Sequence, residues 1–129
     1  MLSLAAVAVS LFLAAPSQAA MVESLSGKYL VSYELSPEPL KSGPAELSYD
    51  LRDLGDGPAN ELVKATTRLW MPAMGHGSRP TKTVERGAKG HYEVSGAYFL
   101  MPGIWEVIVE AQAADGSVET FKIPVRVTH

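Results

Sequence analysis

The chain has 129 residues, a formal net charge of -3 and no cysteine. Its lysines and arginines are dispersed among acidic residues and form no clustered basic face, so we expect no nucleic-acid partner. The lack of cysteine excludes a disulfide framework, a lipidated cysteine and a thiolate metal site. Any site for a soft metal ion must therefore use methionine and histidine.

The N-terminal residues have the pattern of a secretory signal peptide. Leu2 to Ala15 is almost wholly apolar, Pro16 interrupts the run, and Ser17-Gln18-Ala19 supplies the small residues that signal peptidase recognises. The apolar stretch is shorter than the ~20 residues that a membrane-spanning helix needs. We therefore expect a signal peptide at residues 1–19 and one domain at residues 20–129, periplasmic or secreted, with no stable membrane insertion after cleavage.

Residues 20–129 alternate apolar and polar side chains between closely spaced turns, which is typical of an antiparallel β protein. Strands are expected at residues 29–35, 47–52, 63–69, 81–86, 91–95, 104–111 and 121–127. About seven short strands without a helical period predict an all-β, immunoglobulin-like sandwich of two antiparallel sheets.

The alternation also predicts which residues form the core. On the third expected strand, Val63, Ala65, Thr67 and Leu69 share one face. The last two strands carry the most apolar faces and should form the centre of the core, and the hairpin at residues 81–95 should lie outside. Pro124 cannot donate a ladder hydrogen bond, so the last strand should be an edge or carry a bulge.

The segment Trp70-Met71-Pro72-Ala73-Met74-Gly75-His76-Gly77 is the leading candidate for a functional site. It places two thioethers and an imidazole in one loop at a strand end, and these soft donors suit Cu(I). Met71, Met74 and His76 are the predicted ligands. Met101, in a second Met-Pro pair, is a further candidate ligand if the loops converge, and the indole of Trp70 is a candidate cover for the ion.

A structural interpretation of the same residues remains open. Strand parity places Met71 with Ala65 and Leu69, where methionine serves as adaptable core filling. Trp70 then faces outward beside Arg68. Met74 would pack under the loop, His76 would bond to a backbone carbonyl, and Met101 would pack beside Phe99 and Trp105.

Three sequence elements together resemble the exported YtkA-like domains, which are related to the FixH-like proteins. They are the Met71-Pro72-Ala73-Met74-Gly75-His76 loop, Gly90-His91-Tyr92, and Met101-Pro102-Gly103-Ile104-Trp105. The resemblance extends over essentially all of residues 20–129 and implies a β-sandwich with a role in copper handling in the bacterial envelope. FixH-like proteins carry a membrane helix and belong to cytochrome oxidase assembly, so the implied partner is an envelope copper-handling or oxidase assembly protein.

No sequence motif indicates catalysis. The chain has no Gly-x-Ser-x-Gly elbow, no His-Glu-x-x-His pair and no glycine-rich phosphate loop, so we expect a binding protein and not an enzyme. The first functional hypothesis is an exported domain that binds copper as Cu(I) for handling or delivery. The alternative is a metal-free, immunoglobulin-like interaction module that docks an envelope partner such as an efflux or oxidase assembly component.

Overall fold

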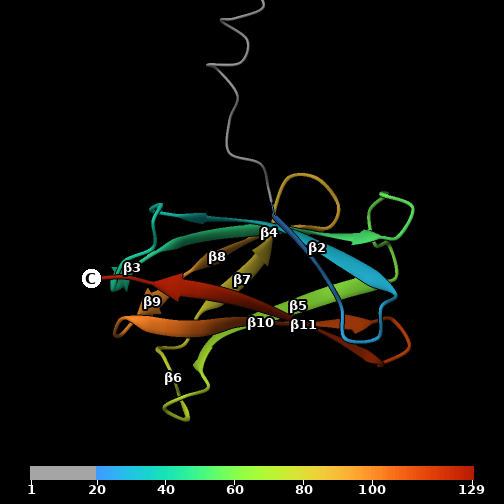
Figure 1. The fold of residues 1–129 in the computed structure, drawn as a ribbon. Coiled ribbons are helices and arrows are strands. Elements are labelled where there is room, and N and C mark those ends of the chain that lie inside the picture. The colour runs from blue at the N-terminus through green and yellow to red at the C-terminus, as the bar shows by residue number, and fades with distance from the viewer. Residues whose placement is uncertain (1–19) are drawn as a thin grey trace, which may run out of the picture.

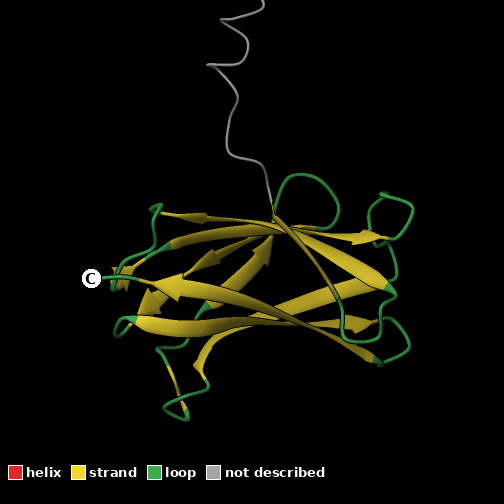
Figure 2. Cartoon of the chain, in the orientation of Figure 1, coloured by secondary structure: helices red, strands yellow, loops and turns green. Residues whose placement is uncertain are grey.

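The computed structural model describes residues 20–129, so the predicted signal peptide at residues 1–19 lies outside the described residues. All regular secondary structure in the described part is β (Figure 2). The strands are β1 (Ala20–Glu23), β2 (Tyr29–Ser36), β3 (Gly43–Pro44), β4 (Glu46–Asp53), β5 (Leu62–Met71), β6 (His76–Gly77), β7 (Lys82–Glu85), β8 (His91–Ser95), β9 (Tyr98–Phe99), β10 (Gly103–Ala113) and β11 (Val118–Val127). Within residues 20–129, no helix has the length and apolar character needed to cross a membrane.

The strands form two antiparallel sheets that face each other (Figure 1). One sheet has the order β1-β2-β4-β8-β7 and the other β11-β10-β5-β6, with a small β3-β9 pair beside them. The order β2-β4-β8-β7 opposite β11-β10-β5 is that of a seven-stranded immunoglobulin constant-type sandwich. The predicted fold class is confirmed, and the seven predicted strands correspond to these seven; β1, β3, β6 and β9 were not predicted.

The last hairpin supplies the centre of the core, as predicted. Trp105 and Val107 on β10 and Phe121 on β11 are completely buried. Tyr49 and Leu51 on β4 of the other sheet are also almost fully buried. Burial of each such side chain contributes about 1.5–3 kcal/mol relative to exposure.

Pro124 lies on an edge strand, as its chemistry requires. β11 is the first strand of its sheet, and Pro124 pairs with Glu106 of β10. An edge strand needs ladder hydrogen bonds on one side only, so a missing amide proton is tolerated there.

Two expectations about the strands were wrong in detail. Val63 is 50% exposed, whereas its neighbour Leu62 is 1% exposed. The register of β5 against β10 shifts where Gln112 pairs with Lys64 and Ala113 pairs with Leu62. This irregularity skips Val63 and reverses the alternation at the start of β5. In the predicted outer hairpin only β7 is an edge, because β8 lies between β4 and β7.

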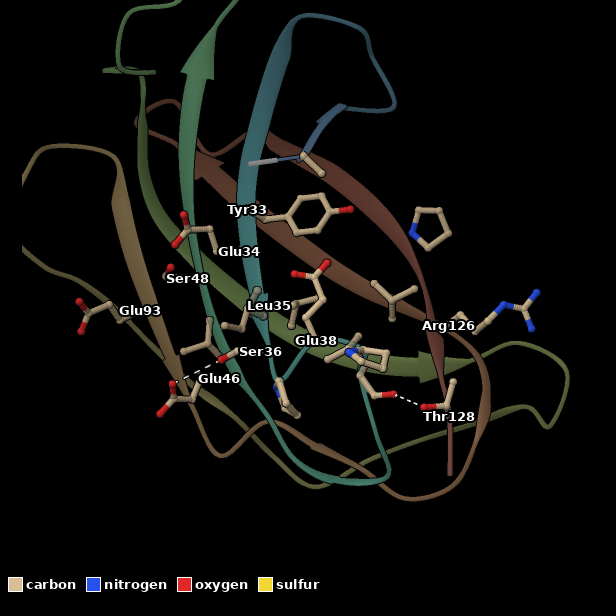
Figure 3. A pocket seen from close by; sticks show the side chains of 18 residues that line it. Tyr33, Glu34, Leu35, Ser36, Glu38, Glu46, Ser48, Glu93, Arg126 and Thr128 are labelled. Carbon is tan, nitrogen blue, oxygen red and sulfur yellow. Dashed lines mark hydrogen bonds between the residues drawn. The ribbon is translucent and has the colours of Figure 1, made fainter. Parts of the chain in front are cut away.

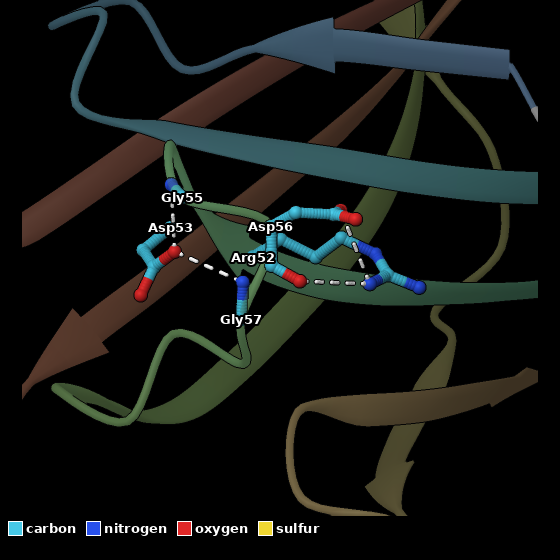
Figure 4. A network of polar contacts seen from close by, with 5 residues as sticks. All are labelled: Arg52, Asp53, Gly55, Asp56 and Gly57. Carbon is cyan, nitrogen blue, oxygen red and sulfur yellow. Dashed lines mark hydrogen bonds and ion pairs between the residues drawn. The ribbon is translucent and has the colours of Figure 1, made fainter.

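The connection from β4 to β5 is held by its own polar groups (Figure 4). The carboxylate of Asp53 accepts hydrogen bonds from the amides of Gly55 at 2.9 Å and Gly57 at 3.0 Å. Asp56 has a φ of 69° and lies 3.4 Å from the guanidinium of Arg52. Aspartate tolerates such turn geometry and bonds its own backbone, so these local contacts shape the turn that leads the chain toward β5.

The end of β5 and the start of β10 are locked together by one close contact. Gly103 has a φ of +139°, and a Cβ at that position would lie 2.4 Å from Cε of Met71. The methyl group of Met71 therefore packs directly on the backbone of Gly103. Only glycine permits both this approach and this backbone conformation.

Substitution of Gly103 tests that contact. We expect Gly103→Ala to lower the free energy of unfolding by about 1–3 kcal/mol because the new methyl group overlaps Cε of Met71. Met71→Ala alone should cost about 2–5 kcal/mol. In the Met71→Ala background, Gly103→Ala should cost less, because the overlapping atom is gone. Urea unfolding of the four chains measures this coupling, and strictly additive losses would contradict the contact.

Tyr49 and Tyr92 stack on each other in the core, but their hydroxyl groups differ in hydrogen bonding. The rings of Tyr49 and Tyr92 are 5.5 Å apart. The hydroxyl of Tyr49 lies 2.9 Å from Oγ1 of Thr67, which also accepts a bond from Thr83. The buried hydroxyl of Tyr92 has no hydrogen-bond partner among the described residues. Burial raises the pKa of both phenols, so both remain protonated at neutral pH.

These tyrosines form a matched pair for mutation. Tyr49→Phe should lower the free energy of unfolding by about 0.5–1.5 kcal/mol, because it removes a satisfied buried hydrogen bond. Tyr92→Phe should leave stability unchanged or raise it, because it removes an unsatisfied buried hydroxyl. Denaturant unfolding at pH 7 compares the two, and equal losses would show that the hydroxyl of Tyr92 is bonded in solution.

Candidate functional site

The predicted methionine loop is a tight hairpin between β5 and β6, which projects from one end of the sandwich (Figure 1). Trp70 pairs with Gly77, and Met71 pairs with His76. The carbonyl of Met71 accepts hydrogen bonds from the amides of Met74 at 3.2 Å and Gly75 at 2.9 Å. Gly75 has a φ of +67°, which closes the four-residue loop at little cost. The loop is thus a defined turn that fixes the strand ends that carry Met71 and His76.

Met71 belongs to the core and also faces His76. Its side chain is 6% exposed, so the packing interpretation of this residue is confirmed. Directly paired residues of antiparallel strands project to the same face, with Cβ atoms about 4.5–5.5 Å apart. The hairpin therefore presents one thioether and one imidazole on its core-facing side.

His76 is half-buried and is held by two contacts. Its ring meets the ring of Trp105 edge-on, with centroids 5.8 Å apart and an interplanar angle of 69°. Its Nδ1 lies 2.9 Å from the carbonyl oxygen of Gly77. Because a carbonyl oxygen only accepts, Nδ1 carries the proton in this contact and Nε2 keeps its lone pair. Such a second contact is what orients a metal-binding histidine.

Trp105 connects this hairpin to the second methionine. Its Nε1 donates a 2.9 Å hydrogen bond to the carbonyl of Met101, and its ring also meets Phe99 edge-on at 5.6 Å. The side chain of Met101 is partly buried against the core, as the packing interpretation predicts. The hairpin, through the ring of His76, and the Met101-Pro102 segment, through the carbonyl of Met101, therefore contact the same indole.

Met74 and Trp70 point away from this cluster. Met74 is 56% exposed at the tip of the hairpin, so the prediction that it packs under the loop was wrong. Trp70 faces outward, with the guanidinium of Arg68 5.8 Å from its ring centroid, as the packing interpretation predicts. Adjacent residues of a strand face opposite sides, so Trp70 cannot cover an ion held on the side of Met71. The indole next to His76 belongs to Trp105 instead.

The segment after the hairpin is anchored to β9. The hydroxyl of Ser78 donates to the carbonyl of Tyr98, and the guanidinium of Arg79 lies 3.8 Å from the centroid of the Tyr98 ring. These contacts hold Ser78 and Arg79, which follow β6, against Tyr98 of β9. Elsewhere in residues 20–129, histidine and carboxylate side chains form no group of three that could hold a metal ion.

The hydrogen bond of His76 to a backbone carbonyl, that of Gly77, is the contact that the packing interpretation predicts. Two features of this site were missed from the sequence: the ring of Trp105 beside His76 and the close approach at Gly103. The glycine and tryptophan of Met101-Pro102-Gly103-Ile104-Trp105 did carry a signal, because they form a spaced motif with Met101.

Comparison with known proteins identifies the family. Residues 26–110 match the model of the YtkA-like family, and the match includes both Met-Pro segments and the Gly90-His91-Tyr92 element. Searches of curated proteins and of solved structures found no significant match. Because the family match extends from the turn before β2 into β10, over well more than half of the chain, this chain belongs to the YtkA-like family.

Proposed function

We propose that this domain binds one Cu(I) ion at the β5–β6 hairpin and serves in copper handling or delivery in the cell envelope. The observation that carries the proposal is the pairing of Met71 with His76, in which the bond from Nδ1 to the carbonyl of Gly77 leaves Nε2 with its lone pair. A thioether and an imidazole are donors that Cu(I) accepts. Neither side chain has a thiol group, so neither can form the disulfides that cysteine forms in an oxidising compartment.

The proposed ligands differ in exposure, which suggests different roles. His76 would bind through Nε2 beside the apolar ring of Trp105, and an apolar shell favours a soft, weakly hydrated ion. Met74 stands exposed at the hairpin tip, where an incoming or departing ion would meet it first. Met71 or Met101 would complete the set from the buried side.

Membership of the YtkA-like family is compatible with this proposal but does not name a ligand. The burial of Met71 equally suits a domain whose hairpin is purely structural. That alternative is the metal-free interaction module, and copper titration separates the two.

Anaerobic titration with Cu(I) against a chromophoric chelator measures affinity and stoichiometry. The unmodified protein should bind one equivalent. His76→Ala should weaken binding by ~10–100-fold or more, because the substitution removes the imidazole ligand. Met74→Leu should weaken it with the fold intact. His91→Ala is the matched control. His91 is also half-buried, but it lies in the sheet that does not contain the hairpin, where it bonds to Asp50. No competition with the chelator, or equal effects of both histidine substitutions, would reject the copper site.

Methionine methyl signals identify which thioethers bind. Ag(I) is a diamagnetic substitute for Cu(I), and its addition should shift the ¹³C-methyl resonances of Met74 and of Met71 or Met101. Met21 is a built-in control, because it is 51% exposed on β1 and lies outside the hairpin. Shifts at Met21, Met71, Met74 and Met101 alike would indicate indiscriminate thioether binding, and no shift would leave the hairpin with a structural role.

A further inference from the structure

A large groove opens at one end of the sandwich, between the ends of β2, β4 and β8 of one sheet and β11 of the other (Figure 3). Its volume is about 1110 Å³. The buried side chains of Leu40, Leu47 and Val94 form its apolar base. The space is therefore long and partly apolar, and it lies outside the methionine hairpin.

The groove has an acidic rim, because Glu34, Glu46 and Glu93 project from the face of their sheet opposite to Leu35, Leu47 and Val94. Among the described residues, Glu38 also lines the groove, and Arg126 is the one cation that does so. Glu46 accepts a bond from the hydroxyl of Ser36, and Glu93 is paired with Arg86 at 3.4 Å. Glu34 and Glu38 take part in no ion pair among the described residues, and Figure 3 shows the carboxylate of Glu38 between β2 and β11. The uncompensated charge therefore lies on Glu34 of β2 and on Glu38 in the segment that follows β2.

Within residues 20–129, one wall of the groove is a strand edge that no other strand covers. β1 pairs with β2 only from Leu30 to Tyr33, where Ala20 is opposite Tyr33. In the described part of the chain, the remaining residues of β2, from Glu34 to Ser36, pair with β4 alone. Their outward backbone groups face the groove, and such an edge can accept an added strand. The opposite wall, β11, is also an edge strand.

We propose that this groove binds an extended, basic segment of a partner protein, which adds as a strand to β2 beside Glu34–Ser36. Alternate side chains of an added strand face opposite ways. Lysines or arginines on one face of the segment would then meet Glu34, and apolar side chains on its other face would cover Leu35 and the base of the groove, beside Glu38 (Figure 3). This site goes beyond the proposed copper function and does not depend on it.

The charge of the groove points to another protein as the occupant. The residues that precede Ala20 in this chain contain no lysine or arginine, so they do not complement the carboxylates. The groove also reaches the end of the sandwich that carries the hairpin. Thr128 lines it, and the preceding residue, Val127, pairs with Gly103, on which Met71 packs.

Fluorescence anisotropy with labelled peptides tests the proposal. The probe is a heptapeptide of alternating lysine and valine, and the comparison peptide alternates glutamate and valine. We expect saturable one-site binding of the lysine peptide only. The double variant Glu34→Gln, Glu38→Gln should weaken it at least fivefold. The control, Glu106→Gln with Glu110→Gln on the other sheet, changes the net charge equally and should have little effect. Equal weakening by both double variants would overturn the proposal.

Backbone methylation separates strand addition from simple charge attraction. Two versions of the lysine peptide, N-methylated either at the lysines or at the valines, each block one edge of the added strand. At least one should lose binding, because the edge that pairs with β2 needs its amide protons. Unimpaired binding of both would reject strand addition.

Two other occupants of the groove give distinct results. If the N-terminal segment of this chain fills the groove, the peptide will bind only to a variant shortened to begin at Ala20. If a second copy fills it, the peptide will dissociate a dimer in sedimentation. Either result would also reject the proposal.

Discussion

The burial of Trp105 is the interaction on which the rest of this structure depends. Its indole is completely buried between the sheets, and its Nε1 is satisfied by the carbonyl of Met101. A buried tryptophan contributes much of a small core, provided that its N–H finds a partner. The same ring meets Phe99 and His76 edge-on. The core of the sandwich and the candidate site therefore share one side chain, and neither can be rearranged without the other.

Because of this sharing, the proposed copper binding would be coupled to folding. Met71 packs on Gly103 in the core while it faces His76 across the hairpin, so a ligand that holds Met71 and His76 also holds the ends of β5 and β10 together. A ligand that binds only the folded state raises its stability by RT ln(1 + [L]/Kd). A site on a free loop would instead order the loop and leave the sandwich unchanged. The hairpin geometry thus favours a rigid, preformed site over a flexible metal-binding tail.

The sequence predicted the fold well because a two-residue period extends over most of each long strand. It also predicted the burial of Met71 and the outward position of Trp70, since parity carries through a regular strand. It failed at Val63, where the register shift against Gln112 and Ala113 breaks parity. It also failed at Met74, because a turn tip has no strand parity to follow. The bond of His76 to a backbone carbonyl follows the packing interpretation, but its contact with Trp105 was not predicted, because Trp105 lies 29 positions along the chain.

The candidate site and the groove are linked through β10 and β11. The two proposed sites have different tasks, because one would bind the metal ion and the other would bind a partner protein. Transfer of Cu(I) between proteins proceeds by exchange of ligands, so at least one donor must be reachable from outside; Met74 is reachable, whereas Met71 is not. Exchange also requires that two proteins stay in register while the ligands change. A basic segment on the edge of β2 would supply that register through backbone pairing and charge, without using any metal ligand. Docking and metal exchange would then be carried by separate residues, joined through β11 and the start of β10.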